Sequence, residues 1–292
     1  MTKPGANFAA ELRRELSARN QAFARQRRLL HVESCGGLPV VVYQPQENPA
    51  RHGNFIDDSY AAIRSHAPWL KRLGKTHAQA RAALPRDGRA WKELDSCNSS
   101  DALLMNIFCY PEVARSTAVA ALLGVERSEV PDFGFKARVP LKNGGGDRTE
   151  VDLRLGTLLM EAKLTEANFQ ARETAWVRGY RDFRTVFDAT LLAQSEGNFL
   201  SYQLIRNVLA AYAHACSFCV LLDARRPDLL ESWYSVMRAV RLLDLRVRCK
   251  ALTWQELSAA VPPLLREFLD LKYGIVAPGC VASAIPALEA AL

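Results

Sequence analysis

One short stretch decides the fold: residues 149–166 read TEVDLRLGTLLMEAKLTE. Two runs that alternate apolar and polar residues meet at Gly156-Thr157, which is typical of a β-hairpin with a two-residue turn. Strands point successive side chains to opposite faces. Val151 and Leu153 therefore share one face of the first arm, and the acids of that arm share the other.

The register of this hairpin sets carboxylates against each other. If Gly156 supplies the positive φ of a type II′ turn, Asp152 lies opposite Glu161, and Glu150 lies opposite Lys163. Like charges directly opposed across a sheet are destabilising. They are tolerated if both are solvated, if one takes a proton, or if a cation lies between them. A hard cation such as Mg²⁺ suits two carboxylates, water and phosphate.

A second interpretation of the same hairpin is purely structural. In that case Glu150 and Lys163 are partners in a surface ion pair, and the hairpin carries a solvated charged face. The direct opposition of Asp152 and Glu161, with Lys163 next in line, favours a site over this alternative.

Asp152, eight intervening residues and then Glu161-Ala162-Lys163 resemble the PD-(D/E)XK nuclease superfamily, which has the restriction-endonuclease-like fold. The resemblance covers about residues 95–255, and Val151 stands where the superfamily's name has proline. It implies that Asp152 and Glu161 bind Mg²⁺, for which Mn²⁺ is a possible substitute. It also implies that Lys163 assists the attacking water.

The same resemblance points to residues outside the hairpin. The superfamily often carries an acid on its first core helix, and Asp101 is the nearest candidate for that third metal ligand. It often carries a glutamine on the helix after the Glu-X-Lys strand, where Gln203 stands, and Gln203 and Asn207 are spaced to point the same way. Glu150 and Glu166 are further auxiliary candidates.

Apolar spacing and turn residues predict the other elements. We expect helices over residues 1–30, 57–94 (interrupted near Pro68 and Pro85), 99–110, 166–193, 199–216, 228–244 and 255–273, and strands over 40–43, 133–141, 219–224 and 246–254. This order predicts an α/β protein whose restriction-endonuclease-like core is a mixed sheet of about five strands flanked by helices.

The basic excess lies at one end of the chain. Residues 1–100 hold 16 Lys+Arg against 9 Asp+Glu, whereas the remainder holds 22 of each. We therefore expect a basic, mainly helical region over 1–94, followed by the nuclease-like domain over 95–292. A basic region suits a polyanion such as DNA, although solvated helix faces would give the same count.

Composition narrows the class further. The seven cysteines are scattered behind a start that has no apolar secretory core, which predicts reduced thiols in a cytoplasmic protein without a membrane partner. Cys216 and Cys219 have CxxC spacing but no second pair, so buried small side chains are favoured over zinc or redox chemistry.

The resemblance implies a Mg²⁺-dependent deoxyribonuclease, specifically an endonuclease, whose partner is DNA, and a homodimer is one expected assembly. The alternative is a non-catalytic nucleic-acid-binding or interaction protein that keeps the nuclease fold. A redox protein that uses Cys216 and Cys219 is a third, weaker option.

Overall fold

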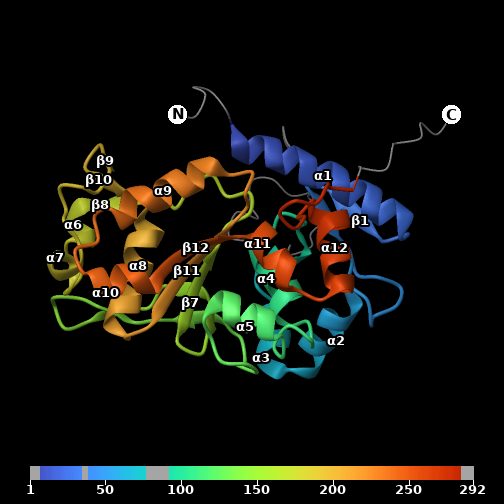
Figure 1. Cartoon of the computed structure of the whole chain (residues 1–292). Coiled ribbons are helices and arrows are strands. Elements are labelled where there is room, and N and C mark those ends of the chain that lie inside the picture. The colour runs from blue at the N-terminus through green and yellow to red at the C-terminus, as the bar shows by residue number, and fades with distance from the viewer. Residues whose placement is uncertain (1–6, 35–38, 77–91, 284–292) are drawn as a thin grey trace. The chain divides into compact units, whose positions relative to one another are not determined.

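The structure is a computed structural model that describes residues 7–34, 39–76 and 92–283 (Figure 1). The chain forms two compact units. One, the sheet unit, contains Glu129–Thr253; the other, the helical unit, combines Asn7–Ser128 with the segment that begins at Trp254. The chain thus leaves the helical unit at residue 128 and returns to it at residue 254.

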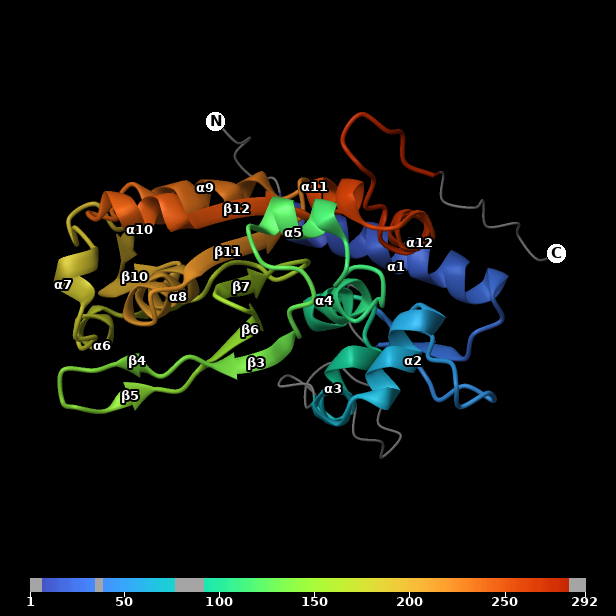
Figure 2. The same cartoon turned by 60° about the horizontal axis from the view of Figure 1, so that its bottom comes forward.

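The sheet unit is built on five strands: β3 (Asp132–Lys136), β6 (Glu150–Leu155), β7 (Leu158–Ala162), β11 (Ser217–Leu222) and β12 (Cys249–Thr253). Their order is β12-β11-β7-β6-β3, with β3, β6 and β7 antiparallel and β7, β11 and β12 parallel (Figure 2). The predicted mixed sheet of about five strands is confirmed. A short ribbon of β4 (Val139–Pro140) and β5 (Gly146–Asp147) precedes β6.

The hairpin has the predicted register. Leu153 pairs with Met160 and Leu155 with Leu158, as a two-residue turn at Gly156-Thr157 requires. Apolar residues of β6 are buried and alternate with partly exposed ones, whereas every residue of β7 is buried. Because β7 lies between β6 and β11 in the middle of the sheet, Glu161 is buried with its apolar neighbours.

Helices pack on this sheet. The helix α8 (Tyr202–Ala213) contacts β7 and β11, and α10 (Leu243–Arg248) contacts β11 and β12. The helix α9 (Pro227–Met237) reaches β11 through Trp233, whose ring centroid lies 5.9 Å from that of Phe218. These contacts enclose a continuous hydrophobic core.

The prediction of one long helix over 166–193 is wrong. The chain instead forms β8 (Ala171–Glu173), α6 (Thr174–Val177) and α7 (Phe183–Val186), and β8 joins β9 (Gln194–Ser195) and β10 (Asn198–Leu200) in a three-stranded sheet. Val177, Tyr180 and Phe183 have helical spacing and are buried, which explains the prediction. A tight turn at Gly179 separates the two short helices, and a Cβ there would lie 2.8 Å from the Trp176 carbonyl oxygen.

Two other predicted helices are divided. The expected helix over 228–244 is α9 and α10, and α10 continues to Arg248, so that β12 starts later than predicted. The expected helix over 255–273 is α11 (Trp254–Ala260) and α12 (Pro263–Tyr273). Pro263 is the first residue of α12, where its missing N–H costs nothing, and the helix before it has already ended.

The helical unit also contains these elements: α1 (Phe8–Gln26), β1 (His31–Glu33), β2 (Val41–Tyr43), α2 (Asp57–Ser65), α3 (Ala67–Arg72), the 3₁₀ helix η1 (Glu93–Asp95), α4 (Ser100–Phe108) and α5 (Thr117–Leu123). They confirm an α-rich N-terminal region, while the interruption predicted near Pro85 lies outside the described residues. Among the helices that the structure describes, none has the length and apolar character to cross a bilayer.

The predicted boundary after residue 94 does not coincide with the division between the units. Asn106 on α4 donates to the Asn54 carbonyl and accepts from the Ile56 N–H, and Ser59 Oγ donates to the Asn106 carbonyl. These bonds tie α4 to the segment before it. The first helix after residue 95 is therefore a buried helix inside the helical unit.

Lys272 lies at the centre of the helical unit and is fully buried. Its Nζ lies 2.7 Å from both Asn20 Oδ1 and the Tyr43 hydroxyl and 3.2 Å from the Gly53 carbonyl oxygen. Burial lowers the pKa of this amine well below its ordinary value. The group thus links α12 to α1 and β2 through hydrogen bonds.

Gly156 provides a test of the hairpin turn. It has φ of 55°, and a Cβ at this position would lie 2.9 Å from Glu129 Cδ. We expect Gly156→Ala to lower the free energy of unfolding in urea by about 1–2 kcal/mol, because an L-residue is strained at positive φ.

Gly144→Ala is the matched control, since Gly144 has φ of 82° and no heavy atom within 4 Å of an added Cβ. Gly144→Ala should lower the free energy of unfolding only by the cost of placing an L-residue at positive φ. A Gly156→Ala protein as stable as the parent would contradict the turn described here.

Candidate active site on the hairpin

Glu161 is a buried carboxylate with three side-chain donors. It is 1% exposed. Its Oε1 accepts hydrogen bonds from Lys163 Nζ and Gln203 Nε2, both at 2.8 Å, and its Oε2 accepts one from Asn207 Nδ2 at 2.7 Å. Because Gln203 and Asn207 are one turn apart on α8, both amides reach the same carboxylate, as their spacing predicts.

Asp152 lies on the other arm of the hairpin. Its Oδ2 accepts a hydrogen bond of 2.8 Å from the backbone N–H of Ala162, the residue after Glu161. The hairpin register brings this carboxylate to the Glu161–Lys163 segment.

Lys163 is 5% exposed and is surrounded by negative charge. Burial acts to lower its pKa, but the carboxylates of Glu161, Glu166 and Asp152 outweigh this and raise the pKa above the ordinary value. Its ammonium is therefore charged at neutral pH. It also lies 5.7 Å from the centroid of the Phe169 ring.

The two predicted auxiliary acids have different surroundings. Glu166 Oε2 accepts a hydrogen bond of 2.6 Å from the Leu164 N–H, and its charge acts on Lys163. Glu150 is in register with Lys136 on β3, and its backbone carbonyl accepts from Arg206. The predicted pairing of Glu150 with Lys163 does not form in the sheet ladder, because Lys163 follows the last residue of β7.

Arg206 is a member of this cluster that the sequence did not reveal. It is 2% exposed, and its Nε and Nη2 donate to Asn207 Oδ1 at 3.0 and 2.8 Å. This fork turns the amide so that its nitrogen faces Glu161 Oε2, which lies 4.0 Å from Arg206 Nη2. The only signal was one positive charge among the apolar residues of LIRNVLAA.

A second polar network, which was also not predicted from the sequence, adjoins Arg206. Asp147 Oδ2 accepts from the hydroxyls of Tyr180 at 2.6 Å and Tyr202 at 3.1 Å. Burial acts to raise the pKa of Asp147, but hydrogen bonds from Thr149 and Tyr180 and the charge of Arg206 lower it overall. Asp147 is thus an ionised partner for this end of α8.

Asp101, the candidate third metal ligand, belongs to the helical unit. Its Oδ2 accepts hydrogen bonds from Arg72 Nη2 at 2.9 Å and Lys75 Nζ at 2.8 Å. Two cations thus neutralise this carboxylate locally. Within the part of the chain that the structure describes, no group of three or more His, Cys, Asp or Glu side chains is arranged to hold a metal ion.

The sheet and its hairpin define the class of protein. Three antiparallel strands continue into two parallel ones, and the hairpin carries Asp152 and Glu161-Ala162-Lys163, as in the restriction-endonuclease-like fold. The family model described as "Restriction Endonuclease associating with ARP" matches residues 18–274 of the chain. The chain belongs to this family, whose function is of the nuclease type. No curated protein and no solved structure matches it.

The buried ion pair supports a stability test. We expect Lys163→Met to lower the free energy of unfolding at pH 7 by about 3 kcal/mol, because Glu161 would lose its nearer cation, with only Arg206 left at 4.0 Å. Since the pKa of Lys163 is raised, its contribution is fully present below the unfolded-state value of about 10.4 and is lost only as the pH rises through the folded-state value.

A double-mutant cycle separates this pair from its surroundings. Glu161→Gln combined with Lys163→Met should cost clearly less than the sum of the single changes. Lys136→Met, at an exposed position of β3, should change stability by no more than about 0.5 kcal/mol. Additive single changes would contradict a coupled pair.

Proposed function

We propose that the chain is a metal-dependent endonuclease that hydrolyses phosphodiester bonds of DNA. One observation carries this proposal: the buried Glu161 carboxylate and Lys163 ammonium, 2.8 Å apart, lie on the hairpin that also holds Asp152. Nuclease-type function follows from the family. The reaction, the substrate and the residues are our proposal.

Mg²⁺ is the proposed cofactor, with Mn²⁺ as a substitute, and Asp152 and Glu161 are the residues that would hold it. Mg²⁺ commonly uses one or two carboxylates and keeps several water ligands, which fits this donor set. Gln203 Oε1 also fits, since it is a buried acceptor without a hydrogen-bond partner among the described residues. When bound, the ion would acidify a water and offset charge on the phosphate.

Asp101 is not part of the proposed metal site. Its carboxylate already accepts from Arg72 and Lys75 within the helical unit. The site therefore rests on two carboxylates of the hairpin.

Lys163 acts as a charged donor in this proposal. Its raised pKa keeps it protonated at neutral pH, so it orients the attacking water or stabilises a phosphoryl oxygen by donating a hydrogen bond. Gln203 and Asn207 hold the Glu161 carboxylate in place through its two oxygens. The basic excess of residues 1–100 supports a polyanionic substrate.

A non-catalytic nucleic-acid-binding protein is the second candidate. The observation in its favour is that both Glu161 oxygens already accept hydrogen bonds from protein side chains. In that case the cluster would be a structural element of the fold. The nuclease would need metal and the hairpin residues to produce cleaved DNA. The binding protein would bind DNA without cleaving it.

DNA cleavage tests the proposal. Purified protein with Mg²⁺ or Mn²⁺ should cut plasmid, linear or single-stranded DNA, and EDTA should abolish cutting. Asp152→Asn, Glu161→Gln and Lys163→Met should each lower the rate about 100-fold or more, because the first two remove proposed metal ligands and the third removes the charged donor. Gel assays of product formation measure this.

The control is Glu231→Gln, an exposed residue of α9, which should cut at the parental rate. Cutting that survives all three site changes, or that needs no metal, would contradict the mechanism. DNA binding without cutting would favour the second candidate, and fluorescence anisotropy on the same proteins separates the two results.

Arg206→Lys tests the role of the fork on Asn207. The substitution keeps the charge but removes the paired N–H donors. We expect the cleavage rate to fall about tenfold, because residues that orient site ligands typically contribute this much, with DNA affinity unchanged. The Mg²⁺ concentration for half-maximal rate should rise.

Arg238→Lys, at an exposed position after α9, is the matched control. If Arg206→Lys lowered DNA affinity and left the rate of bound DNA unchanged, Arg206 would be a DNA contact and not a positioning residue.

A further inference from the structure

The sheet unit carries a basic surface over residues 136–184. Eight Lys and Arg side chains of this segment are exposed, against one exposed acid, Glu173. In the rest of the unit, over residues 185–253, three exposed cations accompany three exposed acids. The excess of positive charge is therefore local to the basic surface. It is hidden in a count along the sequence, because the acids of the hairpin are buried or half-buried.

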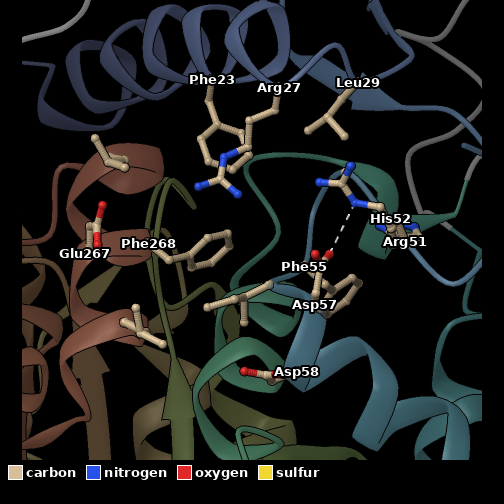
Figure 3. A pocket seen from close by; sticks show the side chains of 14 residues that line it. Phe23, Arg27, Leu29, Arg51, His52, Phe55, Asp57, Asp58, Glu267 and Phe268 are labelled. Atoms are coloured by element: carbon tan, nitrogen blue, oxygen red, sulfur yellow. Dashed lines mark ion pairs between the residues drawn. The ribbon is translucent and has the colours of Figure 1, made fainter. Parts of the chain in front are cut away.

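A cavity in the helical unit shows the opposite arrangement. Its volume is about 350 Å³, and its wall contains Arg27 and Arg51 together with Asp57, Asp58 and Glu267 (Figure 3). Arg51 Nε lies 3.5 Å from Asp57 Oδ1. Positive and negative groups thus offset one another in the cavity, which distinguishes it from the basic surface.

Hydrogen bonds bring two parts of the basic surface together. The ribbon of β4 and β5 extends toward the end of the unit where α6 lies (Figure 2). The Lys142 N–H donates to the Gly179 carbonyl at 2.9 Å, and the Arg181 N–H donates to the Pro140 carbonyl at 3.0 Å. Lys142 Nζ also donates to the Arg178 carbonyl at 2.6 Å. The ribbon is thus fixed against the segment that follows α6, and Lys142 and Arg178 are neighbours.

Aromatic rings hold the arginines of this surface. The Arg172 guanidinium lies 4.8 Å from the centroid of the Trp176 ring and 6.0 Å from that of Tyr202. Arg178 lies 5.9 Å from the centroid of the Phe199 ring. Trp176 is 43% exposed, so its ring and the guanidinium beside it are open to solvent. A side chain that is ordered before its partner arrives loses less entropy on binding.

Carboxylates do not neutralise these cations. Among the residues that the structure describes, four cations of the surface form no ion pair with an acid: Lys142, Arg148, Arg172 and Arg178. Two half-buried acids nearby have other partners. Asp182 pairs with Arg181 at 3.0 Å, and Asp147 accepts hydrogen bonds from two tyrosine hydroxyls. The four cations are therefore available to an external anion.

The basic surface adjoins the hairpin site. Tyr202, whose ring lies beside Arg172, is the first residue of α8, and Gln203 follows it. Gln203 Nε2 donates to Glu161 Oε1 at 2.8 Å. The Tyr202 hydroxyl donates to Asp147, the residue before Arg148. A polyanion bound to these cations would therefore reach the end of α8 that holds Glu161.

We propose that the basic surface binds the phosphate backbone of DNA, with Lys142, Arg148, Arg172 and Arg178 as the phosphate contacts. Guanidinium and ammonium groups match phosphate oxygens, and cations without carboxylate partners release the counterions of a polyanion. The choice of DNA over other polyanions rests on the proposed function, because the surface adjoins the proposed cleavage site. Backbone contacts carry no sequence information, so the surface supplies affinity and orientation.

Fluorescence anisotropy of the full chain in EDTA measures binding without cutting. The probes are a labelled duplex DNA, its single strand and an RNA of the same sequence. Arg148→Ala, Arg172→Ala and Arg178→Ala should each weaken DNA binding about fivefold and lower the slope of log Kd against log salt by about 1, because each removes a phosphate contact. The three changes together should weaken binding about 100-fold.

Two control variants remove the same charge elsewhere. Arg238→Ala lies in the sheet unit outside the basic surface, and Arg25→Ala lies on α1 in the basic N-terminal third of the chain. Both side chains are exposed, and both variants should bind DNA as the parent does. Trp176→Ala should weaken binding about twofold and keep the parental salt slope, because it leaves the charge of Arg172 in place.

Three results would overturn the proposal: no saturable DNA binding by the folded parent, parental affinity in the triple variant, or a preference for RNA over both forms of DNA. A larger loss in Arg25→Ala than in the surface variants would also contradict it, because the main contacts would then lie on α1. Circular dichroism confirms that each variant is folded. If the surface variants lose affinity but the parent never cuts DNA with metal, the surface is supported and the nuclease proposal alone fails.

Discussion

The buried carboxylate of Glu161 is the constraint on which the sheet unit depends. An ionised group at the centre of a sheet is costly unless hydrogen bonds and opposite charge offset its lost hydration. Lys163, which follows the end of β7, provides the charge, and Gln203 and Asn207 provide amides from α8. The position of α8 on the sheet is therefore fixed by polar contacts as well as by its apolar face.

The hairpin that carries Glu161 could be predicted from the sequence. Alternation fixes the faces, and the glycine turn fixes the register, so local residues determine which side chains meet. The residues of the hairpin are therefore enough to bring Asp152 close to Glu161 and Lys163. Gln203 could be added because the resemblance to the superfamily pointed to it, and helical spacing placed the Asn207 amide on the same face.

The rest of the site depends on contacts that have no local signature. Arg206 is defined by its fork on Asn207 and by the Glu150 carbonyl, which is far away in sequence. The segment over 166–200 has helical apolar spacing, yet Gly179 and the strand pairing of β8 with β10 override it. The return of the chain to the helical unit at Trp254 is likewise a tertiary event, which the strand and helix predicted on either side of residue 254 did not reveal.

The two units each bury a lysine, and the contrast between them supports the different roles we give them. Lys163 has carboxylates around it, and its pKa is raised. Lys272 has the oxygens of Asn20, Tyr43 and Gly53, and its pKa is lowered because those partners do not offset its burial. The carboxylates around Lys163 favour its charged form, whereas burial disfavours the charged form of Lys272. Lys163 thus places a positive charge against the hairpin carboxylates, whereas Lys272 joins α1, β2 and α12 through hydrogen bonds.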